Sequence, residues 1–158
     1  MTPPLMTLQE IEATLKQRFP MLMVDSVLSL EPGKSIRAVK NVTLNEPQSR
    51  AYMRAHAGIP CTLIVEAIGQ AASILFAKTA GTETQAEDLL VLGSIDQMTF
   101  PAAVIPGDRM EIEVRVLKFI AGLALVEAEA TVENTLVAKG KVGFARMSWQ
   151  ELRDQLSA

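Results

Sequence analysis

Residues 61–78 read Cys-Thr-Leu-Ile-Val-Glu-Ala-Ile-Gly-Gln-Ala-Ala-Ser-Ile-Leu-Phe-Ala-Lys, and this is the most apolar long segment of the chain. Apolar side chains fall on every face of a helix drawn through it, which is typical of a helix wrapped by the rest of a protein. The stretch is at the short limit for a membrane span, and it carries Glu66 and Gln70 near its middle. We therefore predict a buried core helix, with these side chains inside: Leu63, Ile64, Ile68, Ala72 and Leu75.

The segments on either side of this helix carry the patterns of further helices and of strands. Thr7 and Glu10 fit a capping box, and apolar residues at helical spacing continue to Phe19, so a first helix is expected to end at Pro20. Residues 45–58 lack a clean period and predict a loop with a short helical turn, and residues 81–88 predict a surface loop. Strands or extended segments are expected over 21–30, 35–42, 89–95, 110–116, 123–132 and 136–147, and a short C-terminal helix within 148–158.

One long buried helix and five or six strands predict an α+β domain, with an antiparallel sheet curled around the helix. The 158 residues fit a single domain. The net charge of −3 argues against non-specific binding to nucleic acid. One cysteine excludes an intrachain disulfide, and one histidine argues against a His-rich metal site, so we expect no metal and no cofactor. No signal peptide or membrane segment is expected, and the cytoplasm is the expected location.

Glu66 is the residue of this helix that most needs an explanation. A carboxylate on an otherwise apolar helix is costly to bury without a partner, and Gln70 lies one turn away on the same face, where it can hydrogen-bond Glu66. Glu66 is either a general acid or base, or a carboxylate that reaches an interface or solvent. Pro60 precedes the helix, so the backbone N–H groups of Cys61, Thr62 and Leu63 point out of its start and could polarise a carbonyl oxygen.

Four motifs in the right order carry a resemblance to a known family. They are residues 19–25 (F-P-M-L-M-V-D), residues 40–47 (K-N-V-T-L-N-E-P), residues 59–72 (I-P-C-T-L-I-V-E-A-I-G-Q-A-A), and S-I-D at 94–96 with V-I-P-G-D at 104–108. Together they resemble the 3-hydroxyacyl-acyl-carrier-protein dehydratases of the FabZ type, over about residues 8–147. The resemblance implies the hot-dog fold, a dimer with sites at the subunit interface, and Pro60 and Phe100 beside the substrate tunnel.

The chain departs from the family pattern at the catalytic positions. A match without gaps places Tyr52 where the family has its catalytic histidine and Cys61 where it has a glycine whose N–H polarises the thioester carbonyl, while Glu66 is retained. Dehydration needs a base for the C2 proton of the substrate. Histidine suits that task with a pKa of about 6.5, whereas tyrosine titrates near 10. His56 lies four residues after Tyr52 and is a candidate substitute if one helical turn joins them; a surface or interface histidine is the alternative.

A second departure concerns the carrier protein. The family has a basic stretch after its G-I-D motif, suited to an acidic carrier, but residues 79–108 hold five acids and no Lys or Arg. Arg50 and Arg54 are extra charges in the altered loop that could replace it, unless they only form a solvated loop face.

Three functions remain open at this point. The first is a degenerate dehydratase that acts on an acyl thioester of acyl-carrier protein or coenzyme A, either as a homodimer or larger oligomer or as a heterodimer with a His-bearing homologue. The second is a non-catalytic acyl-binding or scaffolding subunit. The third is a hot-dog thioesterase, in which a carboxylate activates water and a backbone N–H stabilises the oxyanion. Whether the chain is an active enzyme stays undecided at this stage.

Overall fold

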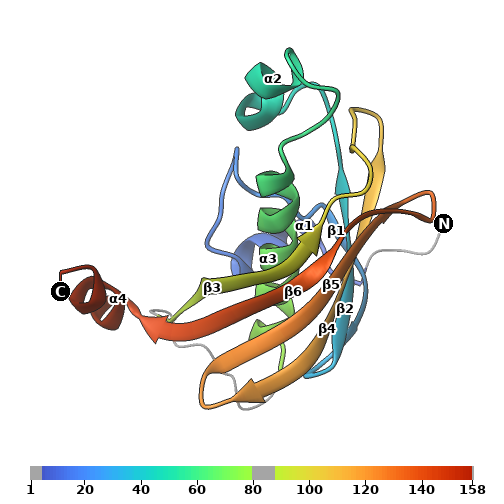
Figure 1. The fold of residues 1–158 in the computed structure, drawn as a ribbon. Helices are drawn as coiled ribbons and strands as arrows, with labels where there is room; N and C mark the ends of the chain where they lie inside the picture. Colours follow the sequence, from blue (N-terminus) through green and yellow to red (C-terminus); the bar gives the residue numbers. More distant parts are fainter. Residues whose placement is uncertain (1–4, 80–87, 158) are drawn as a thin grey trace.

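A 17-residue helix, α3 (Cys61–Ala77), lies against one face of a curved antiparallel sheet (Figure 1). The computed structural model describes residues 5–79 and 88–157. In these ranges the strands pair in the order β1-β2-β4-β5-β6-β3, and every pairing is antiparallel. The arrangement confirms the α+β hot-dog fold. The remaining elements are α1 (Leu8–Thr14), β1 (Ser26–Glu31), β2 (Ser35–Asn41), α2 (Pro47–Met53), β3 (Asp88–Thr99), β4 (Arg109–Ile120), β5 (Leu123–Val132), β6 (Thr135–Ser148) and α4 (Trp149–Leu156).

The core lies between α3 and the inner face of the sheet, as the apolar stretch predicted. Ile64, Ile68, Ala72 and Leu75 are buried, whereas Leu63 is only half-buried because it lies in the first turn of the helix. Within the described ranges, no helix combines the length and the apolar character needed to cross a bilayer.

Alternation in the strands separates the inner face of the sheet from a charged outer face. In β4 the side chains of Met110, Ile112 and Val114 are buried, and the residues between them point outward. The outward-facing residues form cross-strand ion pairs, among them Arg37–Glu111 at 2.7 Å and Lys139–Glu129 at 2.6 Å. Such exposed pairs each contribute little to stability, but their charges identify this part of the outer face as a solvent-exposed surface.

The first helix is shorter than its apolar period predicted, so the expectation that it reaches Phe19 is wrong. It begins with the predicted capping box at Thr7 and ends at Thr14. Beyond it the Arg18 guanidinium donates to the carbonyl oxygens of Leu15 and Gln17, both at 2.8 Å, and Phe19 is 82% exposed. The backbone that follows is irregular up to residue 25. The strand β1 therefore begins at Ser26 rather than at residue 21.

Two further helices agree with the sequence predictions. The short helical turn expected within residues 45–58 is α2. The tail helix α4 begins with the same kind of capping box as α1, formed by Ser148 and Glu151, and buries none of its side chains. The loop expected over residues 81–88 lies outside the described residues except for Asp88, where β3 begins.

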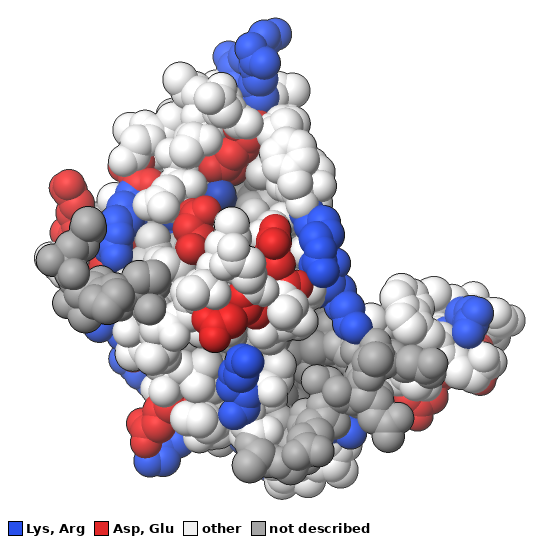
Figure 2. Space-filling model, turned by 180° about the vertical axis from the view of Figure 1, so that it is seen from behind, with Lys and Arg blue, Asp and Glu red and all other residues white. Residues whose placement is uncertain are grey.

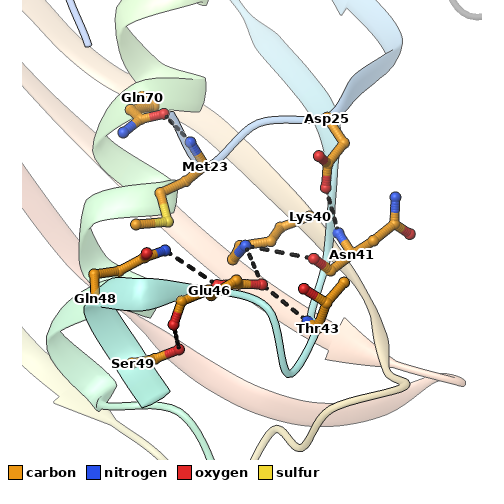
Figure 3. Close-up of polar contacts among 9 residues, drawn as sticks. All are labelled: Met23, Asp25, Lys40, Asn41, Thr43, Glu46, Gln48, Ser49 and Gln70. Carbon is orange, nitrogen blue, oxygen red and sulfur yellow. Dashed lines mark hydrogen bonds and ion pairs between the residues drawn. The ribbon is translucent and has the colours of Figure 1, made fainter. Parts of the chain in front are cut away.

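A buried ion pair fixes the loop that leads into α2 (Figure 3). Lys40 on β2 and Glu46 before α2 lie 3.0 Å apart, and their side chains are only 5% and 12% exposed. The same Glu46 oxygen, Oε1, accepts the backbone N–H of Thr43 at 2.9 Å, and Gln48 donates to the other oxygen at 3.2 Å. The motif at residues 40–47 therefore holds the start of the helix that carries Tyr52.

Candidate active site

Glu66 lies on the second turn of α3, and two side-chain amides hold one oxygen of its carboxylate. Gln70 Nε2 donates to Glu66 Oε1 at 2.7 Å, as the one-turn spacing predicted, and Gln17 Nε2 donates to the same oxygen at 3.1 Å. Among the described residues, no hydrogen bond holds Oε2. The carboxylate is thus oriented through one oxygen, and the other is available to a substrate.

Gln70 also holds the irregular segment that follows α1 against the side of α3. It is fully buried, its Oε1 accepts the backbone N–H of Met23 at 2.7 Å (Figure 3), and its Nε2 donates to the Met21 carbonyl at 2.7 Å. These contacts hold the segment that carries Gln17 against the helix. Gln17 was missed in the sequence because its contact with Glu66 spans 49 positions and no local pattern marks it.

A pocket of about 320 Å³ opens beside Glu66. One wall is a stripe of α3 side chains at successive turns, and the facing wall belongs to β3, which is the edge strand of the sheet. Most of the β3 wall is apolar, and Leu92 and Ile95 remain about half exposed at this edge. The residues that line the pocket are Gln17, Thr62, Val65, Glu66, Gly69, Ser73, Leu90, Leu92, Ile95 and Phe144.

Tyr52 and His56 line a second pocket, of about 260 Å³, near the start of α3. The backbone N–H of His56 donates to the Tyr52 carbonyl at 3.0 Å, so one helical turn does join the two residues. Their rings stack with centroids 4.1 Å apart. Phe100 and the backbone around Gly58 complete the wall, and Gly58 is needed there because a Cβ would lie 2.5 Å from the Val104 carbonyl oxygen.

The start of α3 borders this second pocket. Pro60 is the N-cap residue, and Cys61 is an exposed free cysteine that lines the pocket. Of the three N–H groups expected to be free there, that of Leu63 donates to the Pro60 carbonyl at 2.9 Å and is not available to a ligand. A substrate oxygen could therefore use only the N–H groups of Cys61 and Thr62.

The predicted site residues fall into two groups within one protomer. Glu66 lines the first pocket, whereas Tyr52, His56, Cys61 and Phe100 line the second, and no side chain lines both. Gln70 is buried behind Glu66, and neither Gln70 nor Pro60 lines either pocket. Across residues 5–79 and 88–157, no group of three or more His, Cys, Asp or Glu side chains could hold a metal ion.

Comparison with known proteins gives the family. Residues 15–141 match the FabA-like domain. The 3-hydroxyacyl-[acyl-carrier-protein] dehydratase FabZ of Dechloromonas aromatica (strain RCB) is 38% identical over 141 residues, which cover 89% of this chain and 98% of the relative.

Solved structures share the fold at low sequence identity. The dehydratase heterocomplex ApeI:P from Xenorhabdus doucetiae superposes with a TM-score of 0.76 over 100% of both chains, at 15% identity. A hypothetical thioesterase from Streptococcus pneumoniae TIGR4, solved with coenzyme A, gives a TM-score of 0.59 over 78% of this chain and 85% of its own, at 9% identity. With its match over residues 15–141 and its FabZ relatives, the chain belongs to the FabA-like family of 3-hydroxyacyl-acyl-carrier-protein dehydratases.

Proposed function

We propose that this chain is an acyl-thioester-handling subunit of the dehydratase family in which the acid is retained and the base is altered. It works as a slow, degenerate homodimer or as one half of a heterodimer with a His-bearing homologue. The observation that carries the proposal is the separation of the two pockets: Glu66 is held ready in one, and Tyr52, at the proposed histidine position, lies in the other.

A partner subunit would unite the two halves. The pocket beside Glu66 is bordered by β3, an edge strand whose free backbone groups can pair with a second chain. Pairing of two β3 strands about a two-fold axis would extend the sheet and bring the Tyr52–His56 loop of one subunit toward Glu66 of the other. ApeI:P, which shares the fold, is described as a dehydratase heterocomplex, so a mixed pair of subunits is an assembly that this fold supports.

The proposed chemistry assigns a role to each residue. Dehydration removes the C2 proton of a 3-hydroxyacyl thioester and expels the C3 hydroxyl as water. Glu66 gives a proton to the leaving hydroxyl through Oε2, while the N–H of Cys61 polarises the thioester carbonyl. Tyr52 donates hydrogen bonds but is a poor base, so His56, stacked against it, is the only imidazole of this chain that could take the C2 proton. In a heterodimer, the homologue's histidine would take it.

The direct test is product analysis with a 3-hydroxyacyl-carrier-protein substrate. We expect little enoyl product from the purified chain and more when a His-bearing homologue is added. With Glu66→Gln in this chain, adding the homologue should not increase the amount of product. Turnover near an ordinary enzyme rate of about 10 s⁻¹ by the unmodified chain alone would contradict the proposal, and His56→Ala would then identify the base. Release of free acid with Glu66-dependent kinetics would favour the thioesterase alternative. Acyl binding without any turnover would favour a scaffolding subunit.

Assembly through β3 gives a separate prediction. Ile95→Lys should convert the dimer to a monomer at micromolar concentration, because a charge on the edge strand opposes pairing. Leu117→Lys is the matched control, since both side chains are 49% exposed but Leu117 lies on β4, away from this edge. Sedimentation velocity distinguishes the two. A stable monomer in the unmodified protein, or equal dissociation by both variants, would contradict pairing through β3.

Gln17 is expected to act as a positioning residue for Glu66. Gln17→Met keeps the side-chain length and removes the N–H that reaches Oε1, so the turnover number should fall about tenfold while KM changes little. The measurement is made in the Tyr52→His background, where turnover is expected to be measurable. Gln9→Met, an exposed position of α1, is the matched control. A loss confined to KM, or the same loss in the control, would exclude this role.

A further inference from the structure

The helix α2 carries two exposed arginine side chains that take part in no ion pair among the described residues. Arg50 lies in its last turn and Arg54 is its C-cap residue, and both are exposed. Their spacing of four residues places them on one face of the helix. Within the part of the chain that the structure describes, neither forms an ion pair. Basic atoms accordingly appear at the top of the molecule in Figure 2, where Figure 1 places α2.

The lining of the second pocket itself carries no positive charge. The pocket is lined by α2, the start of α3 and residues 100–104, and none of its lining residues is Lys or Arg. Residues 79–108 contain neither. Lys40 is buried and neutralised by Glu46, whose carboxylate is in turn unavailable to the two arginines. Arg50 and Arg54 therefore supply positive charge that no acidic side chain of the described residues neutralises.

We propose that the exposed face of α2 formed by Arg50 and Arg54 is the docking surface for an acidic acyl-carrier protein. The inference rests on the proposed function, and it names where the carrier binds. The two arginines, which form no ion pair, would attract an acidic partner to this end of the molecule. The net charge of −3 on the whole chain would oppose its binding elsewhere.

The geometry of α2 suits delivery of a tethered substrate. Tyr52 on α2 and His56 just after it line the second pocket. Arg50 and Arg54 each lie two residues before one of them, an offset that places side chains on opposite sides of a helical turn. A helix with its side chains is about 10–12 Å across. An extended phosphopantetheine arm spans that width, so a carrier on the arginine face can place its thioester in the pocket.

The test is the affinity of a holo acyl-carrier protein for the protein with Arg50→Glu and Arg54→Glu combined, measured by titration calorimetry. We expect the Kd to rise at least tenfold, and the Kd of the unmodified protein to rise with salt, because the contacts are exposed charge pairs. Arg153→Glu on α4 is the matched control and should leave the Kd unchanged; its side chain is also exposed. Circular dichroism melting verifies that all variants are folded.

A second measurement separates this inference from the proposed function. Where turnover is measurable, the double variant should raise KM for the carrier-linked substrate, leave kcat unchanged and leave a carrier-free pantetheine thioester unaffected. An unchanged Kd for the carrier would overturn the proposal, and so would an equal loss of affinity for a coenzyme A thioester, which would assign the arginines to phosphate binding. Carrier binding that depends on the arginines, without any dehydration even after a His-bearing homologue is added, would refute the proposed function and leave the proposed docking surface unaffected.

Discussion

Tyr52→His is expected to raise dehydration by the homodimer about 10²–10⁴-fold, the usual contribution of a general base. The Glu66 carboxylate is already oriented by Gln70 and Gln17, so under the proposed function a base is the main part that the site lacks. Adding Cys61→Gly should raise the rate further by opening the approach to the helix N–H groups. The measurement is the initial rate with a 3-hydroxyacyl-carrier-protein substrate. Glu66→Gln in the same background should abolish the gain, and an unchanged rate in Tyr52→His would refute the assignment of position 52.

Mixing two defective chains tests whether the site is shared between subunits. On the proposed function, the wild-type chain supplies Glu66 but lacks the histidine at position 52, and a chain with Tyr52→His and Glu66→Gln supplies that histidine but lacks the acid. A mixed dimer would contain one complete site, so activity should appear after co-refolding or subunit exchange. Activity that never exceeds that of either chain alone, in a preparation where mass spectrometry finds mixed dimers, would show that each site lies within one subunit.

The buried pair Lys40–Glu46 should give the largest stability effect. Glu46→Ala leaves the Lys40 ammonium buried without a partner and removes the acceptor for the Thr43 N–H, so we expect a loss of about 3–5 kcal/mol in the free energy of unfolding. For a domain of this size that corresponds to a fall in Tm of roughly 10 °C. Chemical denaturation followed by circular dichroism is the measurement.

Two further variants test the cause of that loss. Glu31→Ala removes the partner of Lys34 in an exposed pair and should leave stability nearly unchanged. Replacing Lys40 and Glu46 together by methionine should cost less than Glu46→Ala alone, because no charge is then left buried. Equal losses in the free energy of unfolding for Glu46→Ala and Glu31→Ala would mean that burial does not make the Lys40–Glu46 pair more important for stability than an exposed pair.

The parts of the fold that the sequence predicted are those fixed by local pattern. The central helix follows from an unbroken apolar run, and β4 follows from strict alternation around Glu111 and Glu113. Both capping boxes, at Thr7 and Ser148, were readable because they depend only on residues three positions apart.

The parts that failed depend on contacts between distant residues. The apolar period continues through Leu15 to Phe19, yet the helix stops at Thr14 because the following backbone is tied to Gln70, far along the chain. The hydrogen bond from Gln17 to Glu66 is invisible for the same reason. That one helical turn joins Tyr52 and His56 was stated only as a condition. Residues 45–58 lack a clean period, so the sequence predicted a short helical turn there without fixing its position.

The helix α4 has a practical consequence for spectroscopy. Trp149, its first residue, is the only tryptophan of the chain and is 53% exposed. Tryptophan emission will therefore report the surroundings of this helix, which buries no side chain, and will be nearly blind to loosening of the core. A change in emission on adding a second protein would signal contact at α4, whereas a fluorescence melt of the isolated chain would understate what happens around α3.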